Sequence, residues 1–179
     1  MPEAGHLATL DVHGDGPGKT GLIVIWKDGA AAQVEYRWGL RPSEPGGRPY
    51  TLIRAEGRTI DRPCLLIANE FVVQTDADAG AGKRRHRVSL VTDRPFFCIA
   101  GLWRPAAQDW PAAYAALTVE ASPDVAPFKD RHMAVVRPED WEDWLRGARP
   151  AEEILRPFPP GSFRIAGPRT RGQGSLFAF

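Results

Sequence analysis

The chain has 179 residues, of which 43% are hydrophobic and 25% are charged, and its formal net charge is +1. This length and composition predict one globular domain with a single sizeable core. A net charge near zero does not indicate a nucleic-acid-binding protein by itself, because domains that mainly bind phosphate are usually more basic. No apolar run is long enough to span a bilayer, and the first residues lack the basic and apolar regions of a signal peptide. We therefore expect a cytoplasmic protein.

The first part of the chain predicts a β-hairpin. Residues 1–20 are rich in Gly, Asp and Pro without apolar periodicity, which predicts a mobile lead-in. Leu22–Trp26 is a short apolar run, Lys27-Asp28-Gly29 indicates a turn, and Ala32–Trp38 alternates as a second strand. Residues 41–49 contain three prolines and two glycines and are predicted to form a loop.

The rest of the chain predicts more strands and then short helices. Apolar or β-branched runs predict strands at 64–75, 87–91, 96–103, 114–120, 132–136 and 163–165. Pro138 begins a short amphipathic helix that Gly147 ends, and Pro150 begins another. We expect a single α+β domain over residues 1–179, built around a curled, barrel-like, mostly antiparallel sheet, with residues 167–179 as a loose tail.

The cysteines and histidines give no sign of redox or metal chemistry. Cys64 and Cys98 each lie in an apolar run, which favours two core thiols over a disulfide. The four histidines and two cysteines show no metal-ligand spacing, so no metal site is predicted. We also expect no cofactor.

Basic residues form two clusters that suggest phosphate binding. Arg54 lies in the arginine-rich segment that precedes the strand at 64–75, where a planar guanidinium can grip phosphate through two hydrogen bonds. The alternative for Arg54 is an internal ion pair with Glu56 or Asp61. The second cluster, at 83–87, is either a solvated hairpin tip or an edge that faces phosphate.

Three further residues leave two interpretations open. Lys129 and Arg131 lie two positions apart, so on an extended segment they share one face, for phosphate contact or for simple solvation. Trp38 could stack on a base, but a tryptophan at the end of a strand also fits a core. The predicted DNA-binding residues are Arg54, Arg58, Arg84, Arg85, Arg87, Lys129, Arg131 and Trp38.

Six segments, in this order and spacing, resemble the SOS-response-associated peptidase (SRAP) family. They are YRWGLRP at 36–42, IRAEGR at 53–58, RPCLLIANEF at 62–71, CIAGLW at 98–103, LTVEASPDVAPFKDR at 117–131 and MAVVRPEDWEDWL at 133–145. The resemblance implies an α+β domain around a β-barrel, with a positively charged groove for single-stranded DNA. It also implies that a cysteine directly after the initiator methionine captures abasic sites as a thiazolidine, with an asparagine, a glutamate and a histidine assisting.

This sequence departs from the family pattern at each of those positions. Pro2 stands in place of the cysteine, Leu52 in place of the asparagine, Val73 in place of the glutamate and Lys129 in place of the histidine. The nucleophile and its partners are missing together, which argues against thiazolidine chemistry. Arg54, Glu56 and Arg131 of the family pattern are retained.

Three functions follow as hypotheses. The first is a monomeric, divergent SRAP-like protein that binds single-stranded or abasic-site DNA in a DNA-damage (SOS) context without crosslinking to it. The second is an enzyme of altered chemistry, in which the amine of Pro2 or Lys129 forms an imine with the aldehyde of abasic DNA. The third is a non-catalytic interaction protein without a nucleic-acid partner, which the near-neutral net charge suggests.

Overall fold

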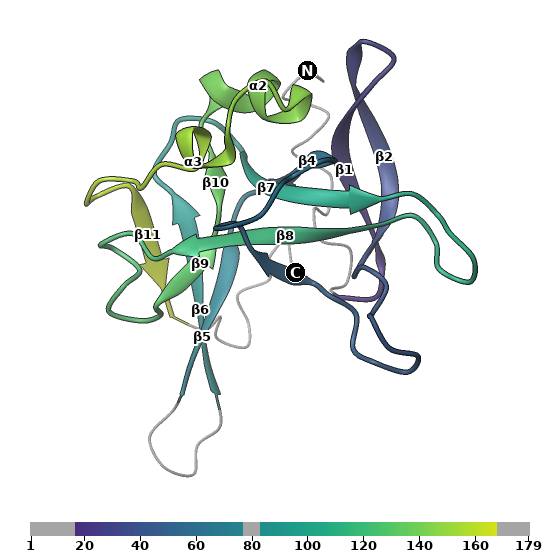
Figure 1. The fold of residues 1–179 in the computed structure, drawn as a ribbon. Coiled ribbons are helices and arrows are strands. Elements are labelled where there is room, and N and C mark those ends of the chain that lie inside the picture. Colours follow the sequence, from purple (N-terminus) through teal and green to yellow (C-terminus); the bar gives the residue numbers. More distant parts are fainter. Residues whose placement is uncertain (1–16, 77–82, 168–179) are drawn as a thin grey trace.

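A curled β-sheet makes up most of the fold in the computed structural model, which describes residues 17–76 and 83–167 (Figure 1). Its strands are β1 (Thr20–Lys27), β2 (Ala30–Trp38), β3 (Leu52–Arg54), β4 (Pro63–Ala68), β7 (Phe97–Arg104), β8 (Ala113–Glu120), β9 (Arg131–Met133) and β10 (Val135–Val136). Neighbouring strands pair in the order β10, β7, β4, β1, β2, β8 and β3, and β7 also pairs with β8. The pairings from β1 through β2, β8, β7 and β4 back to β1 therefore close a ring.

Most of these pairings are antiparallel, and β8 lies parallel only to β2 and β3. The expected α+β class with a curled, mostly antiparallel sheet is confirmed. Strand β3 was not among the predicted strands, because it has only three residues and two of them are exposed. The strand predicted at 132–136 is divided at Ala134. The N–H of Ala134 donates to Leu117 of β8 (2.9 Å), and its carbonyl accepts from Ala100 of β7 (2.7 Å), so this residue crosses between partners.

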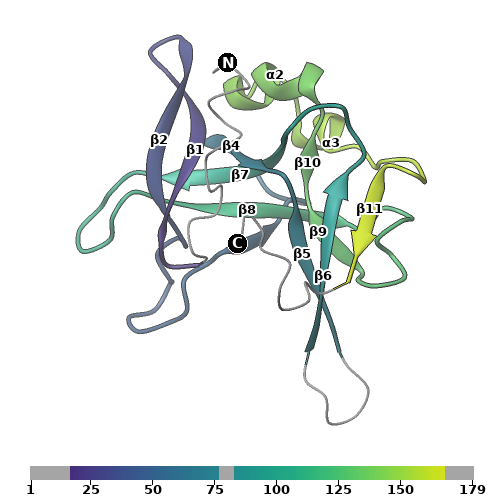
Figure 2. The same ribbon diagram turned by 180° about the vertical axis from the view of Figure 1, so that it is seen from behind.

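A second, smaller sheet contains β5 (Phe71–Asp76), β6 (Lys83–Leu90) and β11 (Phe163–Ala166), in the order β11, β6, β5. The prediction of one continuous strand over 64–75 was wrong, because the chain leaves the ring at Asn69 and Glu70. Residues 64–68 are buried within the ring, whereas Asn69 is exposed, and asparagine readily accommodates such a turn. Figures 1 and 2 show that the β5–β6 hairpin extends away from the ring.

The predicted hairpin at the start of the chain is confirmed. Lys27 pairs directly with Ala30, so the connection between β1 and β2 has two residues. These are Asp28, with φ 52°, and Gly29, with φ 81°. Two consecutive left-handed residues are the pattern of a type I′ turn, whose twist matches that of the flanking strands.

Two short helices cover one end of the ring, and a 3₁₀ turn, η1 (Pro138–Asp140), leads into the first of them (Figure 1). Helix α2 (Trp141–Arg146) ends at Gly147, which has φ 61°, and α3 (Ala151–Ile154) follows. The indole N–H of Trp144 donates to the carbonyl oxygen of Cys64 in β4 (2.8 Å), which fixes α2 on the ring. No helix among residues 17–76 and 83–167 is long and apolar enough to cross a membrane.

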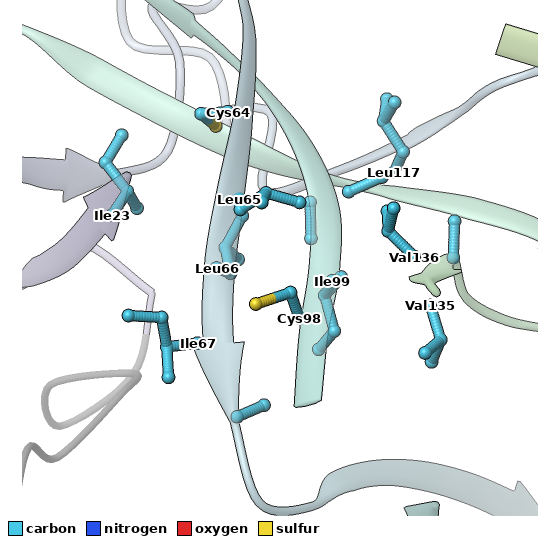
Figure 3. Packing of buried hydrophobic residues seen from close by; sticks show 14 of the residues in the cluster. Ile23, Cys64, Leu65, Leu66, Ile67, Cys98, Ile99, Leu117, Val135 and Val136 are labelled. Atoms are coloured by element: carbon cyan, nitrogen blue, oxygen red, sulfur yellow. The ribbon is translucent and has the colours of Figure 1, made fainter. Parts of the chain in front are cut away.

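The core is one cluster of buried side chains from the strands of the ring, the second sheet and the helices, and Figure 3 shows part of it. Leu66, Ile99 and Leu117 are completely buried there, as are Cys64 and Cys98. Both cysteines are free, so the expectation of two core thiols is confirmed. Burial raises the pKa of each thiol well above its ordinary value. Both thiols therefore stay protonated at neutral pH and are poor nucleophiles.

A buried histidine in the larger sheet packs against the second sheet. The ring centroid of His132 in β9 lies 5.7 Å from that of Phe71 and 5.1 Å from that of Phe163. Its Nε2 accepts a hydrogen bond from the N–H of Ser122 (3.1 Å), and its Nδ1 donates to the carbonyl oxygen of Met133 (2.7 Å). Only a neutral imidazole can accept at one nitrogen and donate at the other. Burial accordingly lowers the pKa of His132.

We expect the free energy of unfolding to fall as the pH is lowered from about 7.5 to about 5.5. The pKa of His132 is lower in the folded chain than its value of about 6.5 in an unfolded one, so the unfolded state binds more protons as the pH falls through that value. Urea unfolding at the two pH values measures the loss. The His132→Gln variant should lose less stability over the same interval, and an equal loss in both proteins would contradict the assignment.

Gly101→Ala is expected to destabilise the fold by about 1–3 kcal/mol, because the core has no space for another methyl group. A Cβ at Gly101 would lie 2.5 Å from Cδ1 of Leu66, 2.8 Å from the carbonyl oxygen of Ala115 and 2.9 Å from Sγ of Cys64. Urea unfolding is the measurement, and Gly167→Ala is the control. No atom lies within 4 Å of a Cβ at Gly167. Equal stability of both variants would show that the strands relax at no cost.

Candidate nucleic-acid interface

One row of side chains faces outward along β3 and its flanking residues. From residue 50 to residue 56, exposed side chains alternate with partly or fully buried ones. This period of two is that of an extended chain with one face on the core. We call the exposed set the β3 row, and it contains Tyr50, Leu52, Arg54 and Glu56.

Arg54 carries the free charge of the β3 row. It is exposed, and its side chain makes no hydrogen bond or ion pair with any residue that the structure describes. The alternative of an internal ion pair does not hold. Glu56 pairs with Arg131, and Asp61 pairs with Arg62 and Arg104, at N–O distances of 2.7, 3.5 and 3.0 Å. The guanidinium of Arg54 is therefore available to an anion from solvent.

Arg131 lies near the β3 row but is bound within the protein. Its guanidinium donates to the carbonyl oxygen of Thr118 (2.7 Å), to Oγ1 of Thr118 (3.2 Å) and to Oε2 of Glu56 (2.7 Å). The Arg131 side chain is 16% exposed. The hydrogen bond from Arg131 lowers the pKa of Glu56, so this carboxylate is charged at neutral pH. The pair is locally neutral, and Arg131 holds the end of the β3 row in place.

The basic cluster of β6 divides into free and bound residues. Arg84 and Arg85 are exposed on the β5–β6 hairpin, opposite Thr75 and Gln74. Arg87 is only partly exposed, and it lies 3.5 Å from the carboxylate of Glu70. The cluster therefore leaves two guanidinium groups, those of Arg84 and Arg85, in contact with solvent. Residues 77–82 lie outside the described part of the chain.

Lys129 follows a residue that contacts the same hairpin. The ring of Phe128 lies 5.0 Å from that of His86 in β6, and Lys129 itself is exposed. The loop that contains both residues thus contacts β6 of the second sheet through Phe128. Phosphate contact by Lys129 stays a prediction. The same holds for Arg58, which is exposed in the segment after β3.

The geometry of Trp38 favours the core interpretation over base stacking. This side chain is 8% exposed. Its indole N–H donates to the carbonyl oxygen of Thr51 (3.0 Å), and its ring stacks on Tyr114 at 6.4 Å between centroids. A base could reach the ring only if the neighbouring strands moved apart. Its role here is to fix the backbone from which the β3 row begins.

Two of the positions that match the family's assisting groups carry apolar side chains. Leu52 is 51% exposed in the β3 row, whereas Val73 is 5% exposed and packs in the core. Pro2 lies outside the described residues. No group of three or more His, Cys, Asp or Glu within residues 17–76 and 83–167 could hold a metal ion.

A cavity of about 170 Å³ lies elsewhere, between the small sheet and α2. Its lining includes Leu90, Arg94, Phe96, Trp141 and Phe158. None of the predicted DNA-binding residues lines this cavity. The basic candidates belong instead to open surface on β3, β6 and the loop before β9.

Sequence reasoning missed two features of this surface, the exposure of Tyr50 and the pairing of Arg131 with Glu56. The apolar–polar alternation of residues 53 to 56 is a signal that could have predicted an extended segment there, whereas Tyr50 and Leu52 are apolar and gave no sign of facing outward. The partner of Arg131 had no such signal, because the two residues lie 75 positions apart.

Comparison with known proteins finds a matching family model and several similar solved structures, including the two that follow. The model of the SOS response associated peptidase (SRAP) family matches residues 15–166. A protein from Bacteroides thetaiotaomicron is 18% identical with a TM-score of 0.64, over 85% of this chain and 75% of that chain. A phage-related protein from Bordetella bronchiseptica is 24% identical with a TM-score of 0.66, over 87% of this chain and 80% of that chain. These two likenesses show the fold alone. None of the curated protein sequences matches the chain.

Replacing Arg131 is expected to cost far more stability than replacing Arg54. Arg131→Met removes three hydrogen bonds and leaves Glu56 and Thr118 without their partner, a loss of about 2–3 kcal/mol for bonds to a charged group. Arg54→Met alters an exposed side chain and should change stability by about 0.5 kcal/mol or less. Urea unfolding of the two variants makes the comparison. Equal destabilisation would contradict the division into a bound and a free arginine.

Proposed function

This chain belongs to the SOS-response-associated peptidase family, and on that premise we propose that it binds single-stranded or abasic-site DNA without forming a thiazolidine crosslink. The observation that carries the proposal is the exposed guanidinium of Arg54, which has no partner among the described residues. A guanidinium matches phosphate geometry and is less strongly hydrated than an ammonium group, so an unpaired one on an open strand suits a phosphate backbone.

Further cations extend the proposed contact surface. Arg58, Arg84, Arg85 and Lys129 are exposed in addition to Arg54. The net charge of +1 means that attraction comes from these local groups and not from the protein as a whole. We therefore expect few phosphate contacts and an affinity that depends on salt with a shallow slope, of about −0.7 per contact on single strands.

The absence of crosslinking follows from the position of the thiols. A thiazolidine needs an amine and a thiol on adjacent carbons, at an accessible N-terminal cysteine. The sequence has two cysteines, Cys64 and Cys98, and both are buried within strands of the ring. Leu52 and Val73 also offer no proton donor or acceptor where the family pattern has an asparagine and a glutamate. The reaction therefore lacks its nucleophile and its partners in this chain.

We expect the variant Arg54→Ala/Arg84→Ala/Arg85→Ala to bind a fluorescent single-stranded oligonucleotide more weakly than the unchanged protein. Each lost phosphate contact makes the slope of log K against log salt about 0.7 less negative, so the three together change it by about 2. Fluorescence anisotropy between low and moderate salt measures both the affinity and the slope.

The control is a second triple variant that removes three positive charges from other parts of the surface. Lys27, Arg94 and Arg146 are exposed on β1, on the loop before β7 and on α2, and their triple alanine variant should keep the slope of the unchanged protein. The proposal fails if the unchanged protein binds single-stranded DNA negligibly at low salt, or if both triple variants lose affinity alike.

Borohydride trapping on abasic-site DNA separates binding from the imine chemistry of Pro2 or Lys129. The proposal predicts no adduct on a denaturing gel, because binding alone forms no imine that borohydride could reduce. An adduct that disappears when the N-terminal amine is blocked, or in Lys129→Arg, would establish the alternative chemistry and overturn the statement that the chain only binds.

A further inference from the structure

Two of the exposed large apolar side chains lie in the β3 row, next to the free arginine. Tyr50 is 45% exposed and Leu52 is 51% exposed, and Arg54 follows at the same spacing. The other exposed large apolar side chains among the described residues are Val91 and Phe128, and neither belongs to this row. An aromatic ring, an aliphatic group and a cation in one line are the chemistry that binds an unstacked nucleic-acid strand.

The ring of Tyr50 is held in place before any ligand arrives. Its N–H donates to the carbonyl oxygen of Leu40 (3.1 Å), and its carbonyl oxygen accepts from the N–H of Leu40 (2.9 Å). Its hydroxyl shares a hydrogen bond with Oγ of Ser43 (2.5 Å). The phenol is thus fixed at both ends while its ring remains open to solvent. A ring that is already fixed loses little conformational entropy when a base stacks on it.

The spacing of the β3 row suits an extended strand. Alternate residues of a β-strand lie about 6.6 Å apart, which is close to the repeat of one unstacked nucleotide. The edge strand β3 pairs only with β8 among the described strands, so its outer side is open. Glu56 at the end of the row would repel phosphate if it were unpaired, but Arg131 neutralises it at 2.7 Å.

We propose that Tyr50, Leu52 and Arg54 bind consecutive parts of a single DNA strand, with a base stacked on Tyr50, Leu52 against the sugar and base edge, and a phosphate on Arg54. This rests on the proposed function and specifies how it is performed. The row selects unpaired DNA because a duplex hides the base faces that Tyr50 needs. It has little preference among bases, since every base offers a face for stacking.

Anisotropy titrations with Tyr50→Ala, Tyr50→Phe and Arg54→Ala test the proposal. Stacking on one aromatic residue accounts for about tenfold in affinity, so Tyr50→Ala should bind a single-stranded oligonucleotide about tenfold more weakly. Tyr50→Phe keeps the ring and should stay within about twofold of the unchanged protein. Tyr50→Ala should keep the salt slope, whereas Arg54→Ala should make it about 0.7 less negative.

An oligonucleotide whose bases are replaced by abasic sugars separates stacking from general damage to the surface. On this probe the penalty of Tyr50→Ala should vanish, while that of Arg54→Ala should remain. Val91→Ala removes an equally exposed apolar side chain outside the row and should change neither affinity. Thermal unfolding of each variant confirms that it is folded at the assay temperature.

The outcomes distinguish this inference from the function on which it rests. If the unchanged protein binds single-stranded DNA with a salt-dependent affinity but Tyr50→Ala binds equally well, the β3 row does not stack bases and the inference is overturned while the function stands. An equal penalty on normal and abasic probes has the same meaning. If the unchanged protein binds neither probe, the proposed function and this inference fail together.

Discussion

Strand β8 is the part of the chain on which the rest of the fold depends, because it pairs with four other strands. It lies beside β7 and β9 in antiparallel pairs and beside β2 and β3 in parallel ones. Residues 113–117 are buried, and three of the five are alanine. Small side chains let the neighbouring backbones approach closely, as at Gly101, where a Cβ would lie 2.8 Å from the carbonyl oxygen of Ala115. The ring closes on this strand.

The exposed end of β8 organises the polar surface. Thr118 pairs with Arg54 in the register of β3 and also accepts two hydrogen bonds from Arg131. Two arginines retained from the same family pattern therefore have different tasks. Arg131 is held by Thr118 and Glu56 and fixes the surface, whereas Arg54 keeps its charge in solvent.

The sequence predicted those features that are encoded locally. The Asp28-Gly29 turn, the helix with Trp144 on its buried face and the apolar runs of β7 and β8 each carry their own signal within a few residues. The sequence did not predict strand boundaries that are set by pairing with residues far away in the chain. The break at Asn69 exists because β4 and β5 pair in different sheets, and Ala134 divides a strand because β7 and β8 compete for it. For Trp38 the sequence left the core and the base-stacking interpretations open, and the contacts with Thr51 and Tyr114 favour the core.

The reactivity of the two core thiols can report how often the folded chain opens. Cys64 and Cys98 lie in adjacent central strands, and the carbonyl oxygen of Cys64 also anchors Trp144 of the covering helix. An alkylating reagent can reach either sulfur only when those strands separate. With a fast reagent, the rate of thiol modification measures the rate at which the strands separate. With a slow reagent, it measures the fraction of molecules that are open. Oxidants that damage exposed thiols in other proteins would leave these two thiols unchanged until the strands separate.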